Sequence, residues 1–159
     1  MPNISAATGS PAVHSAIRTS AARTQVDFDY LLAQARVESA LDPEARAPTS
    51  SAAGLFQFTR GTWLETLQRH GAEHGLGWAA DAITTSGGTA RITDPGLRQA
   101  IMDLRFDPAA AALMAGEFAG VTWGNPGNSP AINGSDTVVF NAALNGAPTG
   151  FTNILVTMQ

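Results

Sequence analysis

The sequence predicts one all-α domain over residues 11–119, with a flexible N-terminal tail at 1–10 and a divergent tail rich in Gly, Asn and Pro at 120–159. Three observations favour this organisation. Apolar residues recur with helical spacing in the central range, two Asp-Pro pairs there provide helix starts, and the helical period stops where the tail begins. The length of 159 residues, 44% of them hydrophobic, suits a single core.

Two helices are expected before Pro43. A short helix is predicted over 11–23, where Val13 and Ile17 are one turn apart. A longer helix is predicted over 26–41, and Pro43 ends it because the residue before a proline is disfavoured in the helical region. Its apolar residues follow the i, i+3, i+4, i+7 pattern: Phe28, Leu31, Leu32 and Ala35.

A loop is expected over 43–58, where Pro, Ser, Thr and Gly are frequent. The next helix is predicted to start at Thr59 or Thr62, and several glycines break up the chain that follows it. The apolar residues of this helix are Trp63, Leu64 and Leu67, and the glycines are Gly71, Gly75 and Gly77.

The last helices begin at pairs in which Asp supplies the N-cap and Pro the first helical position: Asp94-Pro95 and Asp107-Pro108. We expect these helices to end at about Arg105 and Phe118. Residues 120–136 show no helical period, and β-like runs follow at 137–140 and 154–156. The tail is therefore expected to be irregular and partly β.

Composition excludes several kinds of chemistry. The chain has no cysteine, which excludes disulfides, thiolate nucleophiles and Cys-ligated zinc. It has no lysine, which excludes Schiff-base chemistry. The net charge is -4 and the arginines are scattered, so no nucleic-acid partner is expected. The N-terminal residues do not resemble a secretory signal peptide, and no apolar run has the length of a transmembrane segment.

Glu38 stands out among the carboxylates. It follows Ala35 by three residues and Leu31 by seven, so it lies on or near the apolar side of its predicted helix. It also lies near the helix C-terminus, where the dipole disfavours negative charge. Both placements would raise the pKa of its carboxyl group, as a general acid requires. A structural ion pair with Arg36 or a more distant arginine is the alternative from helix position alone.

The residues around Glu38 form two ordered motifs. Residues 38–45 read ESALDPEA and residues 51–58 read SAAGLFQF, followed by Thr62-Trp63. This series resembles the lytic transglycosylase domain of the lysozyme superfamily, whose pattern runs E-S-x-[FL]-[DN]-P-x-A and then [GS]-A-x-G-L-[MF]-Q. The close match covers about 38–63, and the flanking helices match more loosely. The resemblance implies a lysozyme-like, mainly helical fold.

The resemblance also implies a reaction without metal or cofactor. The glutamate that matches Glu38 protonates the glycosidic oxygen between MurNAc and GlcNAc and then accepts a proton from the MurNAc C6 hydroxyl, which closes a 1,6-anhydro ring. No second catalytic carboxylate is needed, unlike in glycosidases with paired acids. The nearest candidate, Asp42, precedes a proline and is expected to cap or turn the chain.

Four residues near Glu38 are candidates for substrate binding. Ser39 follows the catalytic position, although a small residue at a helix end explains it equally well. Gln57 matches the family glutamine that lines the sugar cleft, where an amide can both donate and accept. Gly54 fits a tight backbone approach or a plain turn. Phe56 belongs to the same motif, although Phe56, Phe58 and Trp63 are expected to be core residues first.

The resemblance weakens after residue 120. Family members carry a later A-Y-N-A-G motif whose tyrosine faces the glutamate, but the only tyrosine here is Tyr30, upstream of Glu38. The nearest text, at 142–148, has Leu144 at the tyrosine position. Residues 134–145 also resemble the terminal stretch of repeats-in-toxin proteins, although their glycine-rich repeats are missing.

His70 and His74 are four residues apart, with Glu73 between them, and this spacing is typical of metal ligands on a helix. However, the order is not H-E-x-x-H, and neighbouring glycines weaken the helix. A solvated helix end is the favoured interpretation, and no metal is expected.

The sequence therefore predicts a peptidoglycan lytic transglycosylase of the cell envelope, periplasmic or secreted, that acts on glycan strands. A secretion or flagellar apparatus of the envelope is a candidate partner. Two alternatives stay open: a muramidase that uses water, and a glycan-binding or assembly protein whose catalytic site has decayed.

Overall fold

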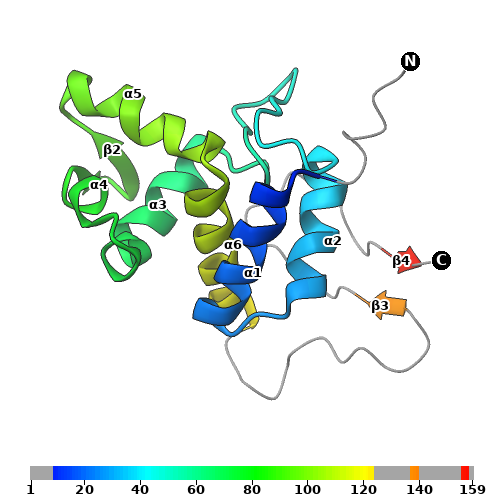
Figure 1. The fold of residues 1–159 in the computed structure, drawn as a ribbon. Helices are drawn as coiled ribbons and strands as arrows, with labels where there is room; N and C mark the ends of the chain where they lie inside the picture. The colour runs from blue at the N-terminus through cyan, green and yellow to red at the C-terminus, as the bar shows by residue number, and fades with distance from the viewer. Residues whose placement is uncertain (1–8, 124–136, 140–154, 158–159) are drawn as a thin grey trace.

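The computed structural model describes residues 9–123, 137–139 and 155–157 and is mainly helical, as predicted (Figure 1). Short 3-10 helices carry the label η. The elements run in the order α1 (Pro11–Thr24), α2 (Phe28–Ser39), α3 (Arg60–His70), η2 (Gly71–His74), α4 (Gly77–Asp81), β1 (Ile83–Ser86), β2 (Thr89–Ile92), α5 (Pro95–Asp103), η3 (Leu104–Phe106), α6 (Pro108–Trp123), β3 (Thr137–Val139) and β4 (Leu155–Thr157).

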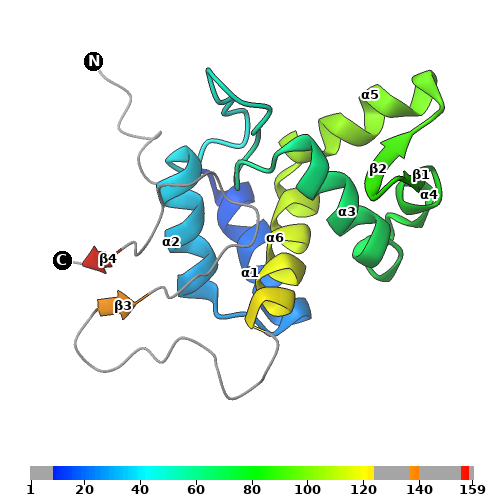
Figure 2. The same cartoon turned by 180° about the vertical axis from the view of Figure 1, so that it is seen from behind.

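Helices α1, α2 and α6 lie side by side and form one half of the molecule (Figures 1 and 2). The contact between α1 and α6 is close, because α6 begins with a run of alanines and carries Gly116. A Cβ atom on Gly116 would lie 2.6 Å from Oγ of Ser20. The buried Ser20 hydroxyl donates a 2.5 Å hydrogen bond to the Ala112 carbonyl oxygen, so α1 is held against the backbone of α6.

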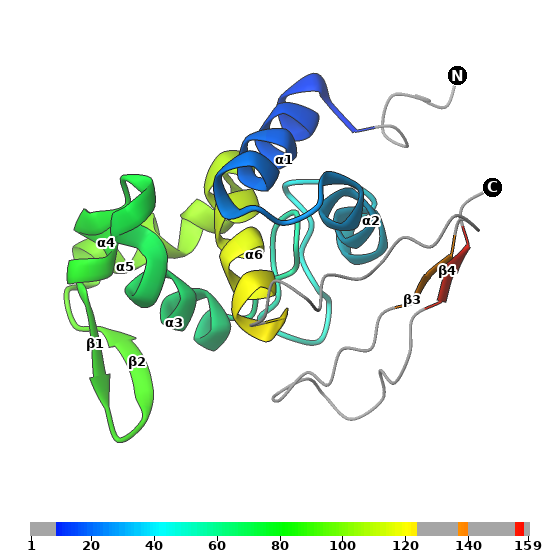
Figure 3. The ribbon, with the colours of Figure 1, turned by 90° about the horizontal axis from the view of Figure 1, so that it is seen from below.

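Helices α3, α4 and α5 and the β1–β2 hairpin form the other half of the molecule. Ile83 pairs with Ile92 and Ser86 with Thr89 in this antiparallel hairpin, which protrudes on the side away from α2 (Figure 3). Gly87 and Gly88 form its turn with φ values of 58° and 77°, and two positive φ values in a two-residue loop are typical of a type I′ turn. This hairpin was not predicted from the sequence, although a Gly-Gly pair between β-branched segments is typical of one.

The predicted starts of the helices are confirmed where caps are visible. Thr59 accepts a 3.4 Å hydrogen bond from the Thr62 N–H at the start of α3, and Asp94 accepts one of 2.8 Å from the Gly96 N–H at the start of α5. Asp107 does the same for the Ala109 N–H at 3.1 Å. The core predictions are also confirmed, because Trp63 and Phe58 are buried and their rings meet edge to face at 5.1 Å.

One predicted helix end is wrong. Helix α6 continues to Trp123 rather than ending near Phe118, so residues 120–123 belong to the helix and not to an irregular tail. Helix α5 ends at Asp103 and η3 continues from it to Phe106, close to the end predicted at about Arg105. Helix α6 packs against α1 at Gly116, and such tertiary packing stabilises a helix beyond the point at which composition alone predicts its end.

Short strands overlap the predicted β-like runs at 137–140 and 154–156. Residues 137–139 and 155–157 pair antiparallel, with Val138 opposite Val156. The stretches that resemble the third family motif at 142–148 and the repeats-in-toxin end at 134–145 lie outside the described residues, except for β3.

Candidate active site

Helix α2 presents Glu38 in its last turn. The helix starts at an N-cap, Asp27, whose carboxylate accepts a 3.1 Å hydrogen bond from the Tyr30 N–H. One face of the helix is buried through Leu31 and Ala35, both without solvent exposure. This apolar face fixes the rotation of the helix and therefore the direction in which Glu38 leaves it.

Helix α2 ends in an unusual way, with two consecutive non-glycine residues in the left-handed region. Ala40 has a φ of 54° and Leu41 a φ of 63°. Their N–H groups donate to the carbonyls of Arg36 at 2.9 Å and Ala35 at 3.2 Å, which satisfies the end of the helix. The Leu41 side chain is buried. This packing offsets the backbone strain, which costs about 1–2 kcal/mol per residue in this region.

Asp42 turns the chain immediately afterwards. Its carboxylate accepts a 2.9 Å hydrogen bond from the N–H of Glu44, which is an Asx turn. The prediction that Asp42 shapes the chain is thereby confirmed.

Among the described residues, nothing pairs with the carboxyl group of Glu38. The residue is exposed at the surface, yet desolvation by the surrounding protein raises the pKa of its carboxyl group. Within residues 9–123, no hydrogen bond or ion pair is formed by this carboxyl, so the alternative of an ion pair with Arg36 is not seen. A carboxyl group with a raised pKa and no cationic partner holds its proton at higher pH than an ordinary glutamate.

Ser39 connects the helix end to the second motif. Its hydroxyl lies 2.7 Å from the Leu55 carbonyl oxygen and 3.0 Å from that of Ala35, and its single hydrogen is donated to the closer Leu55 oxygen or shared between the two. Ser39 therefore holds the 54–57 turn beside Glu38. From the sequence, a hydrogen-bonding role for Ser39 and a simple preference for a small residue were equally open. The structure shows that the Ser39 hydroxyl anchors the turn by hydrogen bonding.

Gly54 makes a tight backbone approach. It is buried, its φ is +83°, and a Cβ atom there would lie 2.0 Å from the Arg105 carbonyl oxygen. Its N–H donates to Ala45 at 2.8 Å. The approach is to the protein's own chain, so both the turn and the close contact require glycine at this position.

Gln57 stabilises the same turn through its side-chain amide. Its Nε2 donates to the carbonyl oxygens of Ala45 at 3.1 Å and Gly54 at 2.9 Å, and its backbone has a φ of 51°. Both amide hydrogens are thus used inside the loop, so any contact of Gln57 with a sugar would involve its Oε1. Phe56 is only 6% exposed and packs in the core.

Arg105 is a residue of the site that sequence reasoning missed. Its side chain is buried, and it donates to three carbonyl oxygens, those of Ser51 at 2.7 Å, Phe58 at 3.1 Å and Met102 at 3.0 Å. Desolvation, with smaller contributions from the positive charges of Arg60 and Arg46, lowers its pKa. The guanidinium therefore clamps both ends of the second motif to the end of α5. A single arginine between Leu104 and Phe106 gives no sequence signal for such a role.

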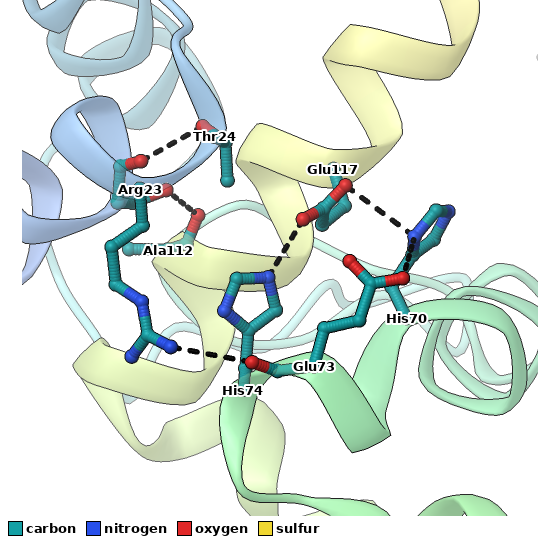
Figure 4. A network of polar contacts seen from close by, with 8 residues as sticks. Arg23, Thr24, His70, Glu73, His74, Ala112 and Glu117 are labelled. Carbon is teal, nitrogen blue, oxygen red and sulfur yellow. Dashed lines mark hydrogen bonds and ion pairs between the residues drawn. The ribbon is translucent and has the colours of Figure 1, made fainter.

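His70 and His74 are not at a solvated helix end, and that prediction is wrong. The His74 side chain is only 4% exposed, and its Nε2 lies 2.7 Å from Oε1 of Glu117 on α6 (Figure 4). The two histidines are covered by a tertiary contact that local sequence does not show, because Glu117 is 43 residues away from His74 along the chain. The cluster lies on α3, η2 and α6, whereas the Glu38 site lies on α2 and the 43–58 loop.

The part of the chain that carries Glu38 and its neighbours also matches a known protein family. Residues 15–76 match the family model described as the transglycosylase SLT domain. The match includes α2, the 43–58 loop and α3, so every candidate residue from Glu38 to Gln57 lies within it. The resemblance predicted from the sequence is confirmed for this segment. In the described part of the chain, no helix is long and apolar enough to cross a membrane.

Proposed function

We propose that this chain, whose residues 15–76 match the transglycosylase SLT domain, is a peptidoglycan lytic transglycosylase. The match supports action on peptidoglycan in general. The finer proposal is that the protein cleaves the glycosidic bond between MurNAc and GlcNAc and leaves 1,6-anhydro-MurNAc, with Glu38 as the only general acid and base.

The observation that carries this proposal is the position of Glu38 in the last turn of α2, at the start of the 38–45 motif and inside the matched residues 15–76. Desolvation raises the pKa of the Glu38 carboxyl, and no described cation stabilises its charged form. The protonated Glu38 can therefore donate its proton to the glycosidic oxygen as the C1–O bond breaks. The resulting carboxylate then accepts the proton of the C6 hydroxyl while that oxygen bonds to C1. The proton returns to Glu38, so the cycle balances without water or metal.

The 54–57 turn is held against the end of α2, next to Glu38 in the sequence. Ser39 anchors the 54–57 turn, Gly54 permits its close packing against Arg105, and Gln57 holds it from within. Phe56 supports the turn from the core. In this proposal Gln57 contacts sugar hydroxyl or acetamido groups through its side-chain oxygen. Ser39, Gly54 and Phe56 contribute by fixing the position of the 54–57 turn.

We further propose that the catalytic unit begins at α1 and extends to the end of α6 at Trp123. The envelope is the expected location, since the glycan strands are there. A local partner such as a secretion or flagellar apparatus would use the same reaction to open the wall.

Mass spectrometry of soluble products from purified sacculi tests the function. Anhydro-muropeptides are expected from the full-length protein. Products with a reducing MurNAc end would instead identify a hydrolytic muramidase, and binding without products would identify a decayed site.

The matched variant for this assay is Glu38→Gln, which keeps the shape but carries no transferable acidic proton. We expect a loss of about 10²–10⁴-fold in cleavage rate with an unchanged circular dichroism spectrum. Glu44→Gln, on an exposed neighbouring position, is the control and should keep its activity. A Glu38→Gln rate above a tenth of that of the wild type would remove Glu38 from the mechanism.

A further inference from the structure

A second group of ionisable side chains lies away from Glu38, at the junction of α3, η2 and α6 (Figure 4). His70 ends α3, Glu73 and His74 belong to η2, and Glu117 reaches them from α6. Arg23 of α1 donates a 3.3 Å hydrogen bond to the Glu73 carbonyl oxygen, which holds η2 in place. The cluster is thus built from elements that are fixed by the fold.

We propose that His70, Glu73 and Glu117 bind a Zn²⁺ ion and that His74 orients Glu117 as a ligand. This proposal is independent of the reaction proposed for Glu38, because it concerns different residues.

The spacing of the donor atoms fits such an ion. His70 Nδ1 lies 3.4 Å from Glu117 Oε2 and 3.8 Å from Glu73 Oε1, and one ligand atom from each residue lies within 4.8 Å of the others. A tetrahedral zinc ion with bonds of about 2.0 Å separates its ligand atoms by about 3.3 Å. Only the Glu73 side chain must move to close the set, and it is 64% exposed and free to rotate.

The Nδ1 atom of His70 provides a second observation. It is buried and makes no hydrogen bond, although two carboxylates face it at 3.4 Å and 3.8 Å. A metal ion placed between the nitrogen and the two carboxylates would use that lone pair and balance both negative charges.

His74 supplies the support that metal ligands usually have. Its ring is nearly fully buried, and its Nε2 lies 2.7 Å from Oε1 of Glu117, on the side of the carboxylate away from the His70 contact. A carboxylate held in this way presents its other oxygen in a fixed direction. Glu117 therefore has one oxygen for His74 and one for the ion.

The donor types favour zinc over harder cations. Imidazole nitrogen with carboxylate oxygen suits Zn²⁺, whereas Ca²⁺ and Mg²⁺ prefer oxygen ligands alone. Three protein ligands leave a fourth position for water.

Equilibrium dialysis of the full-length protein against zinc chloride, after removal of metal with EDTA, tests the proposal. We expect one zinc per chain by elemental analysis and a higher melting temperature with zinc than without it. Glu73→Ala changes an exposed side chain and should fold normally, yet it should weaken zinc binding by 10-fold or more. His74→Gln should weaken binding by about 10- to 100-fold, as the loss of an orienting partner does.

Two controls separate this site from general zinc binding. Glu65→Ala removes an exposed glutamate from the same helix α3, and His14→Ala removes the only histidine outside the cluster. Both should retain one zinc per chain. Absence of stoichiometric zinc in the wild type, or equal binding by wild type and Glu73→Ala, would overturn the proposal. Neither result depends on glycan cleavage, so failure of the zinc site leaves the test of Glu38 unaffected.

Discussion

Gly54 offers the sharpest test of how the second motif is packed against the rest of the chain. An alanine there would have two separate costs. The φ of +83° disfavours any side chain, and the added Cβ atom would lie 2.0 Å from the carbonyl oxygen and 2.9 Å from the carbonyl carbon of Arg105. Because the obstructing atoms are backbone, no side-chain rotation can relieve the overlap.

The two costs can be estimated separately. The left-handed backbone costs about 1–2 kcal/mol for a residue with a Cβ atom. Overpacking of a buried position costs about 1–3 kcal/mol more. Gly54→Ala should therefore lower the free energy of unfolding by about 2–5 kcal/mol, a large part of the total stability of a small domain, which is about 5–15 kcal/mol.

Two other glycines provide matched controls. Gly75 has a φ of +76° but nothing within 4 Å of a Cβ atom, so Gly75→Ala isolates the backbone cost of about 1–2 kcal/mol. Gly61, in α3, has open space and no positive φ, so Gly61→Ala should stabilise by about 0.5–1 kcal/mol.

Urea denaturation followed by circular dichroism measures all three variants. The expected order of stability is Gly61→Ala, wild type, Gly75→Ala, Gly54→Ala. If Gly54→Ala were no less stable than Gly75→Ala, the close contact between the turn and Arg105 would not exist as described.

Three further predictions concern the same region. Ser39→Ala should lower the free energy of unfolding by about 0.5–1.5 kcal/mol through loss of the hydrogen bond to Leu55, and it should slow sacculus cleavage, as chemical denaturation and turnover would show. Because the pKa of Glu38 is raised in the fold, the wild type binds this proton more tightly when folded, so its stability relative to Glu38→Gln should fall as pH rises from the ordinary value of 4.5 through the raised pKa. Melting curves of both proteins from pH 4 to pH 8 would show this, and a constant difference would contradict it. Deletion of 124–159 should leave a cooperative calorimetric transition, since the described core lies between Val13 and Ala119, whereas loss of the transition would show that the deleted segment completes the fold.

Local sequence patterns were sufficient to predict the longer helices and to single out Glu38 as the candidate catalytic residue. The spacing of Leu31, Leu32 and Ala35 predicted α2 and its buried face, and the Asp-Pro pairs predicted where α5 and α6 begin. These features depend on contacts within one or two helical turns, where the sequence carries most of the information.

Long-range contacts were not predictable in the same way. The Arg105 guanidinium reaches the Ser51 carbonyl across 54 positions of the chain, and the Ser51 acceptor is a backbone atom that any residue would provide. The contact of His74 with Glu117 likewise depends on how α6 packs against η2. The helical spacing of His70 and His74 drew attention to a metal site, but the ligand set inferred from the structure pairs His70 with two carboxylates instead.

The surroundings of Glu38 and Glu117 differ, in keeping with the different role proposed for each. Glu117 lies within 2.7 Å of one histidine nitrogen and 3.4 Å of another, so each of its oxygens faces a polar partner. Glu38 has no such partner in the described part of the chain, and desolvation favours its protonated form. A general acid must hold a proton until the leaving oxygen needs it, whereas a metal ligand must be free of one. The two carboxylates thus differ in the partners that the fold gives them. Giving Glu38 a cationic partner is a direct test of its assignment as the general acid. An arginine introduced at Gln34, one helical turn before Glu38 on the same face of α2, should lower the pKa of Glu38 and with it the upper pH limit of glycan cleavage, while zinc binding at Glu117 stays unchanged.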